Sequence, residues 1–137
     1  MKKVFIDTNL FIRYLVNDNL EMAEQVEQLF DKAASGDLRL VTGPPVFFEL
    51  AWTLKSFYKK DREYIYECLK SILGIEGLET LDVDILEPAL EIFNHAAIDF
   101  ADAYIAALAK SVQADSIATF NQKHFKNLDI ALYNFKN

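Results

Sequence analysis

The chain has 137 residues, 52% of them hydrophobic and including 11 Phe and 6 Tyr, which predicts a single domain, 1–137, with a well-packed core. Its net charge of −7 argues against general binding of nucleic-acid backbones, whose affinity comes mainly from Lys and Arg, and favours basic protein partners. Cys68 is the only cysteine, which excludes an internal disulfide, and one Cys with two His argues against a structural zinc site.

Targeting signals are weak in this sequence. No apolar run approaches the roughly 20 residues of a membrane span. Met1-Lys2-Lys3 resembles the basic start of a signal peptide, but Asp7 interrupts the apolar stretch too early. Together with the lone cysteine, this predicts a cytoplasmic protein without membrane contact.

Strands and helices alternate along the predicted chain. Apolar periodicity and turn residues predict, in order, a strand at 3–6, helices at 10–16 and 20–34, a strand at 38–42, helices at 46–58 and 63–73, a strand at 78–83, helices at 85–96 and 100–112, and strands at 116–120 and 130–134. Pro88 is expected in the first turn of its helix, where proline is tolerated. This alternation indicates an α/β fold with a central, mostly parallel sheet of four to five strands flanked by helices.

Four polar residues lie where such a sheet would bind a ligand, beyond the carboxyl ends of its strands. Asp7 and Asn121 each follow a predicted strand, while Glu49 and Asp102 lie in the predicted helices at 46–58 and 100–112. Gathered carboxylates repel one another unless a cation or shared protons compensate their charge. Oxygen-only ligands select Mg²⁺ or Mn²⁺, which can activate water for phosphodiester hydrolysis. The pattern therefore predicts a divalent-metal site.

Each member of this set also has a structural alternative. Asp7 could cap the following helix. Glu49, in an apolar helical turn expected to be largely buried, could form a salt bridge with a Lys or Arg. Asp99 and Asp102 fit the spacing of a capping box. Asn121 could simply be a turn residue.

Smaller polar groups stand beside these acids. Thr8, Asn9 and Thr119 could donate hydrogen bonds to metal-bound water or phosphate, or could be local caps. Elsewhere, one side of the helix at 20–34 is either a solvated face or a docking face for a basic partner, and its acidic residues are Glu21, Glu24, Glu27 and Asp31.

Over essentially its whole length, the chain resembles PIN domains, in particular the VapC-like ribonuclease toxins of type II toxin–antitoxin modules. The order and spacing of four motifs carry the resemblance: Phe5-Ile6-Asp7-Thr8-Asn9, Phe47-Phe48-Glu49-Leu50, Asp99-Phe100-Ala101-Asp102-Ala103-Tyr104-Ile105-Ala106-Ala107, and Thr119-Phe120-Asn121 with Phe125. It implies a Rossmann-like sheet, an RNA endonuclease dependent on Mg²⁺ or Mn²⁺, a homodimer, and inhibition by a cognate antitoxin protein.

The resemblance also implies roles for residues. Asp7, Glu49 and Asp102 correspond to its catalytic and metal-binding acids. Asn121 stands where the family often has Asp, which weakens a second metal site, and Asp99 could supply part of the missing charge as a further metal ligand.

Contacts with RNA are predicted from the basic residues. Arg13, about one helical turn beyond Asp7, is the favoured phosphate contact. His124 is expected to be a surface residue, and because no histidine is expected near the acidic motifs, metal and carboxylate would activate the attacking water.

The residues of the sequence are also compatible with other functions. A Mg²⁺-dependent phosphatase of the HAD type would need a second Asp two residues after Asp7, where Asn9 stands. A solitary RNA-processing nuclease and a catalytically degenerate binding module are the remaining alternatives.

Overall fold

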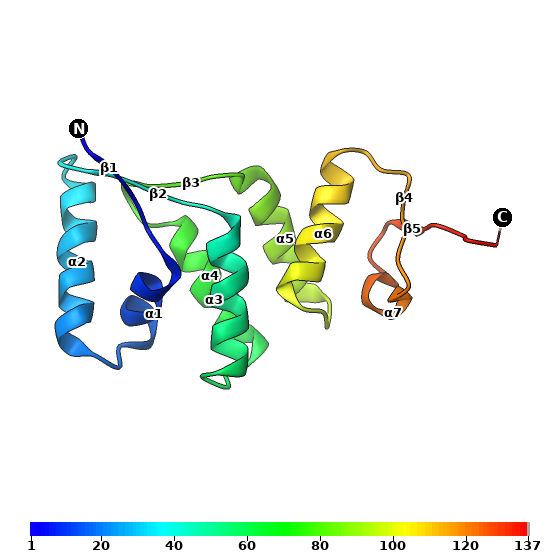
Figure 1. The fold of residues 1–137 in the computed structure, drawn as a ribbon, viewed down its shortest axis with the longest axis horizontal. Coiled ribbons are helices and arrows are strands. Elements are labelled where there is room, and N and C mark those ends of the chain that lie inside the picture. The colour runs from blue at the N-terminus through cyan, green and yellow to red at the C-terminus, as the bar shows by residue number, and fades with distance from the viewer. Residues whose placement is uncertain (137) are drawn as a thin grey trace. The chain divides into compact units, whose positions relative to one another are not determined.

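A computed structural model describes residues 1–136, and these form seven helices and five strands in two compact units, Met1–Val83 and Asp84–Asn137 (Figure 1). The two units are called unit 1 and unit 2 below. No helix in the described part of the chain is long and apolar enough to cross a membrane.

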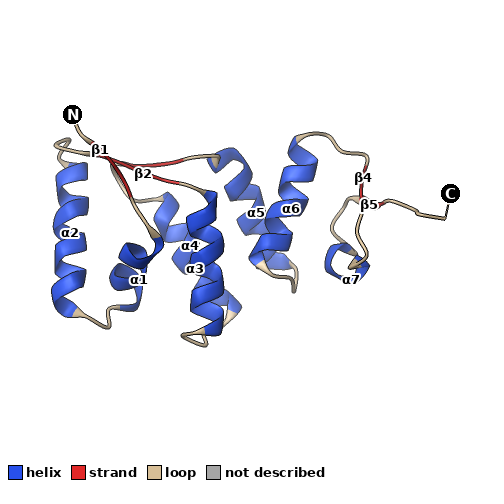
Figure 2. Cartoon of the chain, in the orientation of Figure 1, coloured by secondary structure: helices blue, strands red, loops and turns tan. Residues whose placement is uncertain are grey.

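Unit 1 is built on a three-stranded parallel sheet in the order β1-β2-β3, with strands β1 (Lys3–Phe5), β2 (Arg39–Thr42) and β3 (Leu78–Thr80). Its helices are α1 (Thr8–Val16), α2 (Leu20–Ala34), α3 (Pro44–Ser56) and α4 (Arg62–Leu73). Figure 2 shows the strands along one border of this unit. Parallel strands need long crossovers, and these helices supply them.

The core of unit 1 lies between the sheet and its helices. Phe11, Leu40, Phe47 and Leu69 are fully buried there. They come from α1, β2, α3 and α4, so each element contributes an apolar face to one shared core.

Unit 2 contains most of α5 (Val83–His95), followed by α6 (Phe100–Ser111), β4 (Ser116–Ile117), α7 (Gln122–Phe125) and β5 (Ala131–Leu132). Strands β4 and β5 pair in parallel with each other. Four buried residues form the centre of a small apolar core: Ala106, Ile117, Phe125 and Leu128.

The predicted α/β class with parallel strands is confirmed, but the size of the sheet is not. Among the described residues there is a three-stranded sheet and a separate two-stranded pair, instead of one sheet of four to five strands. The predicted strand at 116–120 ends at Ile117 because the chain turns at Thr119, whose hydroxyl accepts a hydrogen bond from the Asn121 N–H at 2.9 Å.

Two helical predictions also need correction. Pro88 lies inside α5 instead of in its first turn, because the helix begins at Val83, two residues before the predicted start. The short helix α7 was not predicted at all, since four residues are too few to show a helical period.

Candidate functional site

In unit 1, the end of β1 is fastened to the end of β2. The Ile6 N–H donates to the Val41 carbonyl at 2.8 Å, and the Thr42 hydroxyl, fully buried, donates to the Ile6 carbonyl at 3.2 Å. The Ile6 carbonyl belongs to the peptide bond that leads into Asp7. The backbone that carries Asp7 is therefore held at the carboxyl edge of the sheet, where ligands bind in α/β folds.

Asp7 occupies the N-cap position of α1, with φ −86° and ψ 164°, as the capping alternative predicted. Its side chain, however, makes no capping hydrogen bond and is exposed. The carboxylate is therefore open to a ligand, which a capping role alone does not explain.

Glu49 lies on α3, the helix that starts directly after β2, so it follows the strand next to β1. The expectation of a largely buried helical turn is wrong at this position: Glu49 is exposed, while its neighbours Leu50 and Ala51 are buried. No ion pair to Glu49 occurs among residues 1–136, so the salt-bridge alternative lacks a partner there.

In unit 2, α6 presents the second pair of acids. Asp99 is its N-cap by backbone geometry, and the Ala103 N–H donates to the Asp99 carbonyl at 3.0 Å. The Asp99 side chain makes no capping bond, so a capping box does not form. Asp102 lies in the first turn of the helix, and its Oδ2 is 2.9 Å from Nδ1 of His124.

The contact between His124 and Asp102 was missed in the sequence, and the expectation that no histidine lies near the acidic motifs is wrong. Helix α7 begins after Asn121, whose carbonyl accepts a hydrogen bond from the His124 N–H at 3.0 Å. Phe125, next to His124, is buried in the core of unit 2 and anchors this turn. The signal that the sequence offered for this turn was the spacing from Asn121 to His124, followed directly by the apolar Phe125.

The remaining polar candidates differ in their settings. Thr8 is only 5% exposed, whereas Asn9 is exposed. The Thr119 hydroxyl has a local role, because it accepts the hydrogen bond from the Asn121 N–H where the chain turns. The Asn121 side chain is exposed and makes no capping bond, so its amide oxygen is open.

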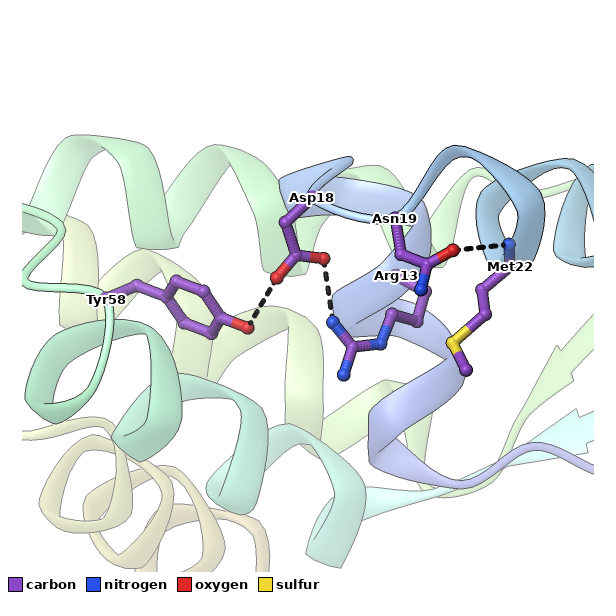
Figure 3. Close-up of polar contacts among 5 residues, drawn as sticks. All are labelled: Arg13, Asp18, Asn19, Met22 and Tyr58. Carbon is purple, nitrogen blue, oxygen red and sulfur yellow. Dashed lines mark hydrogen bonds and ion pairs between the residues drawn. The ribbon is translucent and has the colours of Figure 1, made fainter.

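Arg13, the predicted phosphate contact, is held by an acidic partner (Figure 3). Its Nη1 is 2.7 Å from Oδ1 of Asp18, and the Tyr58 hydroxyl donates to Oδ2 of the same carboxylate at 3.2 Å. The hydrogen bond between Arg13 and Asp18 raises the pKa of Arg13 and lowers the pKa of Asp18. Burial raises the pKa of Tyr58. Figure 3 also shows Asn19 capping α2 through the Met22 N–H, at 3.0 Å. Arg13 is thus oriented, and Asp18 compensates part of its charge.

No three His, Cys, Asp or Glu side chains within the described part of the chain gather closely enough to form a ligand group for a metal ion. The chemistry of the donors nevertheless fits one type of ion. Asp7, Glu49, Asp99 and Asp102 offer carboxylates and Asn121 offers an amide oxygen, and such oxygen ligands suit Mg²⁺ or Mn²⁺.

Two comparisons with known proteins identify the family of this chain. The PIN domain family matches residues 4–131, a stretch that takes in residues of both units. A VapC ribonuclease of Aquifex aeolicus (strain VF5) is 26% identical to this chain over 129 residues, which cover 94% of each protein. Since the family match extends over well more than half of the sequence, this chain belongs to the PIN domain family.

Proposed function

We propose that this protein is a metal-dependent endoribonuclease and acts as the toxin of a toxin–antitoxin pair. Membership of the PIN family supports nuclease chemistry, and similarity to a protein named VapC ribonuclease along 94% of both chains supports RNA as the substrate. The observation that carries the proposal is Asp7. Its exposed, uncapped carboxylate stands at the carboxyl end of β1, beside the strand that leads to the exposed Glu49.

In this proposal Asp7, Glu49 and Asp102 hold Mg²⁺ or Mn²⁺, with Asp99 as a further ligand and Asn121 as a neutral oxygen donor. When bound, such an ion supplies Lewis-acid activation of the phosphodiester and of the attacking water. The carboxylates provide the negative charge that selects a divalent cation and accept the proton that the water gives up. Asn121 brings no charge, which favours one strongly held ion over two.

The RNA backbone must be held against a net charge of −7. Arg13 has further guanidinium N–H groups beyond the one bound to Asp18, and these can donate to a phosphate. The proposal includes a homodimer and a cognate antitoxin as protein partner, as expected from the resemblance to VapC-like toxins. It also includes a cytoplasmic location, as expected from the lone cysteine.

Replacement of Asp7 tests the nuclease. Asp7→Asn preserves shape but removes a charged ligand, so cleavage of a labelled RNA in Mg²⁺ or Mn²⁺ should fall roughly 100-fold or more. Asp31→Asn, which neutralises an exposed acid on α2, is the matched control and should cleave like the wild type. Equal cleavage by purified Asp7→Asn, with an unchanged circular dichroism spectrum, would refute the assignment.

The toxin role has a separate readout. Expression of the wild-type chain should arrest growth of a host cell, whereas Asp7→Asn should not. An active nuclease whose expression leaves growth unaffected would favour a solitary RNA-processing enzyme over a toxin.

A further inference from the structure

One carboxylate in unit 1 joins three segments of the chain. Arg13 belongs to the last turn of α1, Asp18 to the turn before α2, and Tyr58 follows the end of α3. Asp18 lies between the other two side chains, and each of its oxygens accepts one hydrogen bond (Figure 3). Oδ1 accepts from Nη1 of Arg13, and Oδ2 accepts from the Tyr58 hydroxyl. We call Arg13, Asp18 and Tyr58 the Asp18 bridge.

The Asp18 bridge differs from the common pairing of an arginine with a carboxylate. In that pairing, two guanidinium N–H groups donate side by side to both oxygens of the carboxylate. Here Arg13 donates through Nη1 to one oxygen, and the Tyr58 hydroxyl competes with it for the other. Tyr58 therefore keeps Asp18 from engaging the guanidinium with both of its oxygens.

The other donors of Arg13 remain accessible. Figure 3 shows its second terminal nitrogen, Nη2, on the side of the guanidinium away from Asp18. The Arg13 side chain is 35% exposed, so a ligand can reach it from solution. A guanidinium has five N–H donors in a fixed plane and can bind a phosphate through two of them. Arg13 is thus fixed through one nitrogen and can still bind an anion through others.

Helix α1 links the Asp18 bridge to the candidate metal site. Asp7 is the N-cap of this helix, and Arg13 lies six residues later, about 9 Å along the axis. A short stretch of RNA backbone with its scissile phosphate at Asp7 can cover that distance. We propose that Asp18 and Tyr58 are positioning residues, which hold Arg13 half paired so that it binds a phosphate beside the scissile one. This inference rests on the proposed ribonuclease function and assigns residues that help to hold its substrate.

Asp18 affects RNA binding in two opposite ways. Its negative charge repels phosphate and compensates part of the charge of Arg13, which weakens binding. Its hydrogen bond restricts a long side chain, and an arginine that is already ordered loses less entropy when it binds. Both side chains are partly exposed, so water and salt screen the repulsion. We therefore expect the positioning effect to be the larger of the two.

Substitution of Tyr58 tests the positioning effect without any change of charge. Tyr58→Phe removes only the hydroxyl, so Asp18 can then pair with Arg13 through both oxygens. Fluorescence anisotropy of a labelled RNA in EDTA should give a Kd about fivefold higher for this variant than for the wild type. Tyr14→Phe is the matched control, because it removes a hydroxyl next to Arg13 on a ring that packs against Phe30 at 5.0 Å. Its Kd should equal that of the wild type.

Substitution of Asp18 separates positioning from charge. Asp18→Ala removes both the repulsion and the hydrogen bonds, so charge alone predicts tighter RNA binding, whereas positioning predicts a Kd about fivefold higher. Asp18→Asn keeps an acceptor for Arg13 without the charge and should bind RNA at least as tightly as the wild type. In cleavage assays with Mg²⁺, Asp18→Ala should raise KM and leave kcat nearly unchanged, because the phosphate bound by Arg13 does not react.

A double-mutant cycle with Arg13 excludes a purely structural role. When Arg13 is replaced by Gln, the further change Tyr58→Phe should leave the Kd for RNA unaltered, since the residue that Tyr58 positions is gone. An equal loss of affinity with and without Arg13 would mean that the Asp18 bridge only supports the fold, and would overturn the proposal. Unchanged or tighter RNA binding by Tyr58→Phe or by Asp18→Ala would also overturn it.

These results can be read apart from the nuclease assay. Cleavage that depends on Asp7, with Kd and KM insensitive to Tyr58, would reject the positioning roles and keep the nuclease. A Kd that depends on Tyr58 and Arg13, without any cleavage by the wild type, would reject the nuclease and keep the positioning roles. Absence of RNA binding by the wild type, both in EDTA and in Mg²⁺, would reject the positioning roles.

Discussion

At the scale of single residues, two side chains hold the candidate acids in position. Thr42 donates to the carbonyl that precedes Asp7 at 3.2 Å, and His124 contacts Asp102 at 2.9 Å. Thr42 is completely buried, and the Asp102 side chain is only 20% exposed, so both contacts are shielded in part from competing water. The contact with His124 involves Oδ2, one of the two oxygens of the Asp102 carboxylate.

His124 is therefore expected to act as a positioning residue for the proposed metal site. His124→Leu should weaken Mn²⁺ binding about tenfold, in line with other residues that orient ligands, and should lower cleavage with it. His124→Asn should retain most of the affinity because its amide can donate at a position close to that of Nδ1. Titration calorimetry of all three proteins measures this, and tighter binding by His124→Leu would show instead that the imidazole competes with the ion.

At the scale of elements, two glycines in unit 1 have similar positive φ angles but different surroundings. Gly77 leads into β3 with φ +83°, and a Cβ atom there would lie 2.6 Å from the carbonyl oxygen of Ala33 near the end of α2. Gly36 has φ +87°, with nothing within 4 Å of such an atom. The close approach of α2 to the start of β3 therefore depends on the missing side chain of Gly77.

Substitution of each glycine by alanine separates the cost of backbone strain from the cost of a steric clash. Gly36→Ala should lower the free energy of unfolding by about 1 kcal/mol, the cost of a left-handed conformation with a side chain. Gly77→Ala should cost about 3 kcal/mol or more, because the Ala33 backbone must also move. Urea denaturation measures the free energy of unfolding of both variants. Equal losses would mean that α2 and β3 can move apart without an energetic cost.

At the scale of the whole molecule, the family match runs from residue 4 to residue 131 and so takes in residues of both compact units. The net charge of −7 sets the conditions for the proposed activity. Negative charge repels RNA at long range, so the proposed activity would depend on local cations and on a divalent ion that neutralises the acids. Loss of that ion should therefore affect both stability and catalysis.

Metal addition tests this coupling. An ion that binds only the folded chain stabilises it by about 2.7 kcal/mol at 100 times its Kd, so saturating Mn²⁺ should raise the thermal midpoint by several degrees. EDTA should reverse the gain, and Asp7→Asn should show much less of it. A NaCl control at equal ionic strength accounts for screening, and an equal rise in NaCl would dismiss specific binding.

The sequence by itself determined the features that depend on neighbouring residues. Helix α2 occupies its predicted range, 20–34, because apolar spacing and a polar N-cap at Asn19 act within a few residues. The chain order of the acidic motifs likewise pointed to the PIN family, which the family match confirms.

The tertiary structure decided what depends on residues far apart in the chain. Strand pairing divided the strands into two sheets. Packing left Glu49 exposed on a helix whose sequence is mostly apolar. It also placed His124 against Asp102, 22 residues earlier in the chain. The physical reason is that local preferences select helix, strand or turn, whereas exposure and contacts between distant side chains arise only when these elements bury their apolar faces together.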